Sequence, residues 1–419
     1  MFSNKNSLIY FFGTFANSLP QVLLLPLLSN YLTTDEFGLL SIFNASSAII
    51  ICFVAFNSYS YALVYFFKES ESLNKNIKAI NTLVLISFIL IALIISMMHV
   101  LFDINFFQIH YLLIYFSLFH ATIVTLINLR LSILQMQDKA FLFILLQLSI
   151  SVAGLIISYI LVKHYTLGIN GRIAGMILPS IFAFILVSIA IERKTFLSIS
   201  YSYEDIIKIF RYGISFIQYK LLKQLRAHSD KLIIVLILGL SDTGIFAMAL
   251  SISLPILLII TAFDKIMTPR LILKFSNHEN ENIFRSIWPY FIFLLISLIV
   301  LSLIYYIVLL NIFSYFINEK YILSLQIAHL IIVGIIFQGI NLCNTVVYSY
   351  YNQGFLLSKL SYLIFVIQLC ISVALTSSYG IYGSAYSYMF SYFIGFAILT
   401  IGLLIYQKSF TKQSKLNEN

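Results

Sequence analysis

Charged residues are scarce in this sequence. Only 10% of its 419 residues are Asp, Glu, Lys or Arg, whereas soluble domains usually contain roughly 25%. No polar stretch between the apolar runs reaches about 30 residues, which is well short of an independently folding unit. These two absences exclude a soluble protein and a soluble catalytic domain, so any function must lie within the apolar segments.

Sequence motifs of soluble enzymes are missing as well. There is no Gly-Lys dipeptide for a phosphate-binding loop, no HExxH and no GxSxG, and the seven histidines are scattered. Cys52, Cys343 and Cys370 lie singly in apolar runs without CxxC spacing, as is typical of small core residues rather than disulfides or metal ligands. We therefore expect no enzymatic activity, no cofactor and no metal site, and the sequence argues against ATP-driven transport by this chain alone.

Apolar residues make up 61% of the chain and occur in long runs. Because about 20 apolar residues in a helix cross the roughly 30 Å hydrocarbon layer of a bilayer, the sequence predicts an all-α integral membrane protein with about 12 transmembrane helices. The first run is too long for a signal-peptide core and lacks a cleavage site, so we count it as a membrane helix. The predicted spans are 8–31, 38–67, 77–101, 106–134, 140–162, 170–191, 206–239, 244–267, 284–310, 321–350, 356–376 and 381–406.

The basic residues are distributed unevenly over the predicted loops. With the N-terminus inside, the inner loops and tails hold 18 Lys and Arg, whereas the outer loops hold only Lys163, Arg172 and Lys320. The positive-inside rule then places both termini in the cytoplasm. The net charge of +9 is thus explained by topology, and a nucleic-acid partner is not expected.

Two pairs of loops suggest an internal repeat. Residues 35–39 after the first span resemble 241–245 after the seventh, and 168–171 before the sixth span resemble 380–383 before the twelfth. The offsets of 206 and 212 residues are nearly equal, although short glycine-containing turns can also match by chance. We predict two pseudo-symmetric six-helix bundles. The predicted domains are 1–191 for the N-terminal bundle, 192–205 for a charged cytoplasmic linker, and 206–419 for the C-terminal bundle with a short cytoplasmic tail.

Charged residues are concentrated in one predicted span, the seventh. At about 100° per residue, Lys220, Lys223, Arg226, Asp230 and Lys231 fall within an arc of about 140° on one helix face. If this face met lipid, inserting the four cations Lys220, Lys223, Arg226 and Lys231 into the membrane would cost on the order of 10 kcal/mol. The face is therefore expected to line a hydrated, net positive cavity. Two alternatives stay open, namely that 218–231 is an inner loop before one long span, or that the charges serve only as structural pairs.

A cationic cavity suits an anionic substrate that is too polar for the bilayer interior, such as a lipid-linked phosphate or diphosphate. An inside-negative potential favours moving such anions outward. Polar side chains in other spans can hydrogen-bond sugar hydroxyls, although such residues more often join helices to one another. These residues are Asn17, Gln21, Asn44, Asn57, Asn128, Gln147, Gln338, Asn341 and Asn344.

Several loose motifs, in order along nearly the whole chain, resemble a known family. They are the prolines Pro20 and Pro26 followed by 31–38, then 229–234 running into Gly239, then 380–385. This order is similar to that of Wzx-type O-antigen flippases of the multidrug/oligosaccharidyl-lipid/polysaccharide (MOP) exporter superfamily. The family's Ser-Asp-Arg pattern falls on Ser229, Asp230 and Lys231, with Lys in place of the commoner Arg, and its proline after the seventh-helix glycine is replaced by Ser215.

The resemblance implies a multi-pass protein of the bacterial inner membrane with a cationic cavity between two bundles. Such a protein flips an undecaprenyl-diphosphate-linked O-antigen unit from the cytoplasmic to the periplasmic leaflet by alternating access, driven by H+ or Na+. Its partners would be membrane lipid, an O-antigen polymerase and a chain-length regulator. Lys220, Lys223, Arg226 and Lys231 would form the substrate-binding surface, and Asp230 would serve in an ion pair or in coupling.

Three rivals share this composition. An O-antigen polymerase, which is a membrane glycosyltransferase, usually carries a large periplasmic loop, but all outer loops here are short. A drug/cation antiporter of the same superfamily would more naturally line its cavity with acidic residues. A lipid II flippase usually adds two helices to make fourteen.

Overall fold

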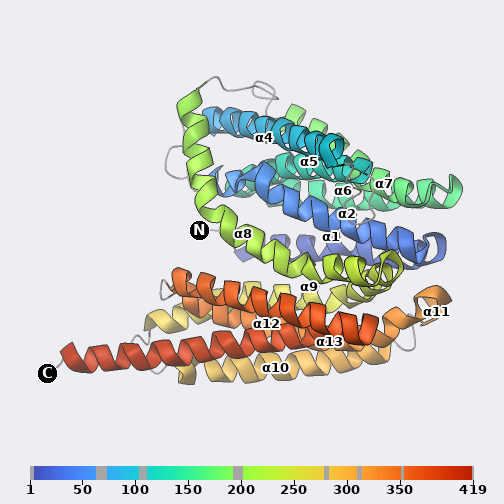
Figure 1. Ribbon diagram of the computed structural model, residues 1–419. Coiled ribbons are helices and arrows are strands. Elements are labelled where there is room, and N and C mark those ends of the chain that lie inside the picture. Colours follow the sequence, from blue (N-terminus) through green and yellow to red (C-terminus); the bar gives the residue numbers. More distant parts are fainter. Residues whose placement is uncertain are drawn as a thin grey trace. The chain divides into compact units, whose positions relative to one another are not determined.

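The computed structural model describes residues 4–62, 73–102, 111–191, 202–277, 283–308, 314–350 and 353–417. Within these ranges the chain forms helices and turns without strands, which confirms the predicted all-α class (Figure 1). In chain order the long helices are α1 (Asn4–Tyr31), α2 (Thr34–Ala55), α4 (Leu73–Phe102), α5 (Tyr111–Met136), α6 (Ala140–Tyr159), α7 (Gly168–Ile191), α8 (Tyr203–Ile237), α9 (Leu240–Asn277), α10 (Ile283–Val308), α12 (Ile322–Tyr350) and α13 (Gly354–Asn417).

These eleven helices agree with the twelve predicted spans once α13 is divided. Its backbone leaves the helical region at Gly380, with φ 59° and ψ −139°, and this break separates the predicted spans 356–376 and 381–406. Among the described residues, eight helical windows are long and apolar enough to cross a membrane, and the window Gly354–Ile405 contains both halves of α13. The chain is therefore a multi-pass membrane protein.

One predicted span is interrupted. The apolar run 38–67 does not form one helix, because α2 ends at Ala55 and both Phe56 (φ 40°) and Asn57 (φ 53°) adopt the left-handed region. Helix resumes at residues 58–62. Asparagine tolerates this conformation better than most residues, but apolar Phe56 gives no warning of a break. Hydropathy alone therefore misses the turn.

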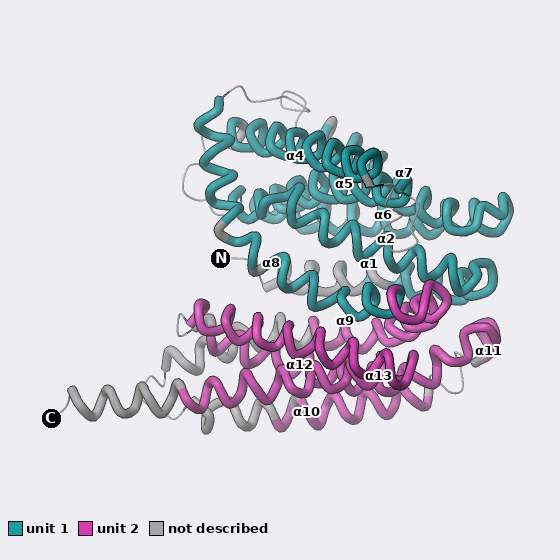
Figure 2. The backbone as a smooth tube through the Cα atoms, viewed as in Figure 1, with its two compact units in different colours: residues 1–235 teal, residues 236–419 magenta. Residues whose placement is uncertain are grey.

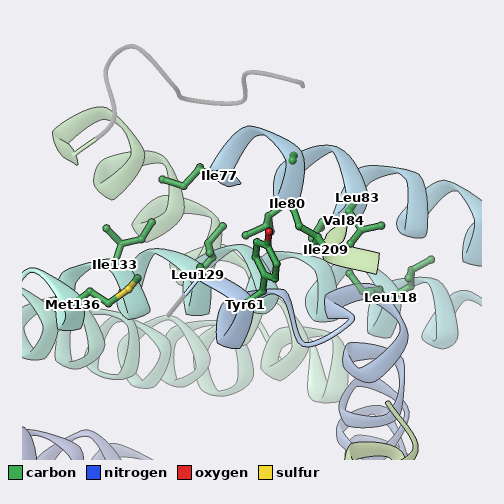
Figure 3. Close-up of a cluster of buried hydrophobic side chains, with 13 residues drawn as sticks. Tyr61, Ile77, Ile80, Leu83, Val84, Leu118, Leu129, Ile133, Met136 and Ile209 are labelled. Atoms are coloured by element: carbon green, nitrogen blue, oxygen red, sulfur yellow. The ribbon is translucent and has the colours of Figure 1, made fainter. Parts of the chain in front are cut away.

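Two compact units divide the chain, residues 1–235 and 236–419 (Figure 2). In unit 1, α1 packs on α6, α6 on α7, and α5 on α2, α4 and α7. Part of its core is a cluster of aliphatic side chains between α4 and α5, which Ile209 of α8 joins. Figure 3 shows these side chains converging from separate segments of the chain.

Unit 2 is built around α12, which packs against α9, α10 and α13. Its interior contains hydrogen bonds as well as apolar contacts. The buried Tyr348 hydroxyl donates to the carbonyl oxygen of Leu399 at 2.9 Å, and the Asn344 side-chain amide donates to Thr400 Oγ1 at 3.2 Å. These bonds join α12 to the second half of α13 and satisfy polar groups away from water.

The first half of α8 packs on the rest of unit 1, at the end of α2 and the helical segment that follows it. The Phe210 ring lies 5.0 Å from that of Phe56, and Tyr212 packs edge-on against Tyr61 at 5.4 Å. Gly213 permits this close approach, because a Cβ there would lie 2.0 Å from the carbonyl oxygen of Phe56. The division between units consequently falls after Val235, about thirty residues beyond the linker expected at 192–205. Of that linker, residues 192–201 lie outside the described residues.

An ion pair fixes the start of α8. Lys75 Nζ of α4 lies 2.9 Å from Asp205 Oδ2, and the hydrogen bond from Lys75 holds the pKa of the Asp205 carboxyl below its usual value. A carboxyl whose folded pKa is lowered stabilises the fold above its unfolded pKa, about 3.9, and loses this contribution as the pH falls through the folded pKa.

We therefore expect Asp205→Asn to lower the melting temperature of the purified protein at neutral pH, and this difference from the wild type to vanish in acid. Thermal unfolding in detergent between about pH 7 and pH 3 measures both. Asp35→Asn, at the exposed first turn of α2, is the control and should not reproduce the pattern. A difference that persists unchanged at the acid end would contradict an ionic contribution.

The loops that suggested an internal repeat share a backbone conformation. Gly168 (φ 52°) and Gly380 (φ 59°) both adopt the left-handed region that favours glycine, and a helix follows each. Three residues later, Gly171 and Gly383 lie where an added Cβ would crowd the preceding helix. The similarity in sequence therefore corresponds to a similarity in local structure.

Candidate functional site

The charged segment predicted in the seventh span is helical, since α8 runs without interruption from Tyr203 to Ile237. The structure therefore contradicts a loop conformation for residues 218–231. Within this helix Lys220 contacts unit 1. Its ammonium donates to the Tyr59 hydroxyl at 2.5 Å and lies 4.0 Å from the centre of the Tyr59 ring. The side chain is half-buried by these contacts.

The other charged residues of α8 differ in exposure. Lys223 is exposed, Arg226 and Lys231 are half-buried, and Ser229 and Asp230 are buried. A single helix face thus carries cations at its accessible positions and a carboxylate at a buried one. We refer to Lys220, Lys223 and Arg226 as the cationic stripe. Its role in binding, and that of Lys231 and Asp230, stay predictions.

Unit 1 also encloses a polar cavity, which we call the unit 1 cavity. It lies among α1, α5, α6 and α7, and its volume is about 340 Å³. Its polar lining residues are Asn17, Gln21, His120, Asn128, Gln147, Ser151, Arg172 and Ser180. None of the described residues that line it is acidic, so its formal charge is positive.

Hydrogen bonds hold several of these side chains in place. Arg172 Nη1 donates to Ser158 Oγ at 2.9 Å, Ser151 Oγ donates to the carbonyl oxygen of Asn17 at 2.7 Å, and His120 Nδ1 lies 2.8 Å from Ser47 Oγ. Two polar atoms of the lining, Arg172 Nε and Gln147 Oε1, are buried and have no hydrogen-bond partner among the described residues. One donor atom and one acceptor atom on lining residues thus have unused hydrogen-bonding capacity.

Small residues between α6 and α7 explain how Arg172 reaches this cavity. A Cβ on Gly175 would lie 2.2 Å from Ser158 Oγ and 2.9 Å from its backbone nitrogen, and one on Gly154 would lie 3.1 Å from the Gly175 carbonyl oxygen. Small side chains let membrane helices approach closely. The close contact places Ser158 beside Arg172, one turn from the start of α7, and so fixes the guanidinium at the cavity wall.

Solved structures of transporters share this arrangement of helices. The lipid II flippase MurJ in an inward closed conformation matches with a TM-score of 0.73 at 15% identity, over 96% of this chain and 87% of that one. An inward-facing MATE family multidrug transporter matches with a TM-score of 0.65 at 14% identity, over 97% and 96% of the two chains. The chain has the MOP transporter fold.

Two further proteins are similar to this chain. A MOP superfamily transporter from Pyrococcus furiosus, described by the reverse polarity of its binding pocket, matches with a TM-score of 0.60 at 14% identity, over 94% of each chain. A Haemophilus influenzae protein named for the Lsg locus is 26% identical over 392 residues, which cover 89% of this chain and 91% of that one. No protein-family model matches the chain.

Within this MOP fold, sequence reasoning found only part of the cavity lining. Asn17, Gln21, Asn128 and Gln147 were expected among the polar residues of the spans, and all four line the unit 1 cavity. Arg172 was counted as an outer-loop cation and instead lies in the cavity wall. Its position four residues after Gly168, inside an apolar run, was the available signal.

Two other residues were overlooked. His120 was one of the scattered histidines, and no spacing marked it as part of a site. Arg130, counted as an inner-loop cation, is fully buried in unit 1, where it donates to Asn81 Oδ1 at 3.1 Å and lies 5.0 Å from the centre of the Phe184 ring. A cation at a predicted span end is thus not always a topology signal.

Proposed function

We propose that this protein is a flippase that moves an undecaprenyl-diphosphate-linked O-antigen unit from the cytoplasmic to the periplasmic leaflet. The cationic stripe of α8 carries the proposal, because a transporter helix retains such charges only where they meet water or an anion. The MOP fold shared with a lipid II flippase supports a lipid substrate. The protein would work by alternating access, driven by an H+ or Na+ gradient.

The stripe suits a diphosphate headgroup. Phosphate oxygens accept charge-assisted hydrogen bonds, which are about twice as strong as neutral ones. Lys223 is exposed and can meet the headgroup directly, whereas Lys220 is held in place by Tyr59. The prenyl chain would stay in the bilayer, and only the headgroup and sugars would cross through protein. Asp230 serves in an ion pair or in coupling.

The remaining parts of the proposal concern location and partners. The flippase would lie in the bacterial inner membrane with both termini in the cytoplasm, where the excess of basic residues places them. An O-antigen polymerase and a chain-length regulator would receive its product in the periplasm. None of the described residues that line the unit 1 cavity is acidic, which weighs against the drug/cation antiporter, because a cationic cargo would need negative charge in the cavity wall.

Deleting the gene in its native strain tests this function. Loss of all O-antigen, with the lipid-linked unit accumulating in the inner leaflet, is the expected result. Lipopolysaccharide capped by a single O-unit would mean that the protein is a polymerase. Unchanged lipopolysaccharide and unchanged lipid-linked sugars would reject both the flippase and the polymerase assignment, and would favour the drug/cation antiporter.

A further inference from the structure

We propose that the unit 1 cavity binds an acidic sugar residue, with Arg172 holding its carboxylate. This site is separate from the cationic stripe of α8, and it would make the transporter specific for glycans that contain such a residue. The inference deepens the proposed function and rests on it for the origin of the sugar. Binding itself can be measured without transport.

The first argument is the charge of Arg172. Its Nη1 donates to neutral Ser158, and its Nε is buried with no partner among the described residues. Among the described residues, no carboxylate forms an ion pair with Arg172, so no carboxylate of this part of the chain neutralises the guanidinium. Arg172 is half-buried, and removing a charge from water without a counter-charge is costly, so a bound anion would offset that cost.

The nearby acidic residue at this end of α7 is already engaged. Glu36 Oε1 accepts from the backbone nitrogen of Ile169 at 3.3 Å, and its Oε2 accepts from the Thr33 backbone nitrogen at 2.9 Å as part of a capping box. Glu36 therefore caps two helices. The guanidinium of Arg172, one turn further along α7, is therefore available to bind a ligand.

The second argument is the rest of the lining. Four carboxamide side chains, from Asn17, Gln21, Asn128 and Gln147, surround the space that Arg172 enters. Carboxamides donate and accept hydrogen bonds, which suits the hydroxyl groups of a sugar. Gln147 Oε1 is buried and has no hydrogen-bond partner among the described residues, so this carboxamide can rotate to bond a ligand hydroxyl without breaking an existing hydrogen bond of that oxygen.

The third argument is size. Ligand pockets start at about 300 Å³, and the cavity of about 340 Å³ lies just above that limit. It is far larger than a single chloride ion needs and too small for an oligosaccharide. One sugar ring with its carboxylate matches the volume, the positive charge and the mixed donors and acceptors together.

Ligand-induced thermal stabilisation of the purified full-length protein in detergent tests binding. Sodium glucuronate, glucose and sodium chloride are the probes, each at about 10 mM and at equal ionic strength. Glucuronate should raise the melting temperature of the wild type, and glucose and chloride should not. No shift with glucuronate, or an equal shift with chloride, would overturn the assignment.

Variants locate the binding site. Arg172→Gln should weaken glucuronate binding at least tenfold, which corresponds to losing one charge-assisted contact. Lys163→Gln, which removes an exposed cation that hydrogen-bonds Tyr159, is the matched control and should bind as the wild type does. If Arg172→Gln fails to fold, Gln147→Leu keeps the charge but removes the unpaired acceptor, and it should also weaken binding. Unchanged affinity in the folded variants would contradict the proposal.

The origin of the sugar is tested separately. Lipid-linked sugars extracted from the native strain should compete with labelled glucuronate, and chemical analysis of the O-unit should find a carboxylate-bearing residue. An O-unit of neutral sugars only, or a failure to compete, would overturn the assignment to the substrate. Because flipping is scored by the deletion phenotype, failure of the cavity assignment and failure of the flippase function are distinguishable.

Discussion

Replacing Lys220, Lys223 and Arg226 together by glutamine is expected to slow O-unit flipping by at least about a hundredfold. Each hydrogen bond to a charged group contributes about 1.5–3 kcal/mol, so losing two of the three would already exceed a hundredfold change. Glutamine preserves length and polarity but removes the charge. The measurement is the rate at which lipid-linked O-unit is lost from the outer leaflet of inverted vesicles, which is the former cytoplasmic leaflet.

A matched control removes the same charge elsewhere. Lys208, Arg211 and Lys359 are exposed cations outside the stripe, so their triple replacement by glutamine keeps the net charge of the first variant. This control should flip at close to the wild-type rate. Wild-type flipping by the stripe variant would reject the stripe as the headgroup site, and equal loss in both variants would point to net charge instead.

Gly213→Ala is expected to destabilise the docking of α8 on unit 1 by about 1–3 kcal/mol, the usual cost of overpacking a tight contact. The added Cβ would meet the backbone oxygen of Phe56 at 2.0 Å, and a backbone atom cannot rotate away as a side chain can. The helix must then shift and carry Lys220 away from Tyr59. A lower melting temperature together with slower flipping is the expected result.

Gly354→Ala is the control for this change, because an added Cβ at Gly354 meets nothing within 4 Å. It should leave both the melting temperature and the flipping rate close to those of the wild type. If Gly213→Ala proved as stable as the wild type, the close contact between α8 and the end of α2 would not exist in the membrane.

The helices could be predicted from sequence because apolar runs of sufficient length have few other structures in a bilayer. The break at Gly380 was found because a glycine-rich motif marked it, whereas the turn at Phe56 and Asn57 was missed because no glycine or proline signals it. The limits of the two units also differed from expectation, since the contacts of Phe210 and Tyr212 with α2 and its continuation depend on tertiary packing.

The candidate sites, too, could be predicted from the sequence only in part. The cationic stripe was visible because five charged residues stand out in an apolar sequence, and helical periodicity places them together. The unit 1 cavity was not, because its lining comes from four helices and only their packing brings Arg172 near Gln147. A single arginine near the end of a span is equally typical of a topology signal, so its place in the cavity wall had to come from the structure.

The placement of α8 also determines where the chain joins the two units. The chain passes once from unit 1 to unit 2, between Val235 and Leu236, and Gly239 follows with φ 96° before α9 begins. This short joint is the covalent connection between the two units. Arg226, the last residue of the cationic stripe, lies thirteen residues before Gly239, about 20 Å at 1.5 Å per residue of helix. The proposed headgroup site thus lies on the helix that leads directly into the connection between the units.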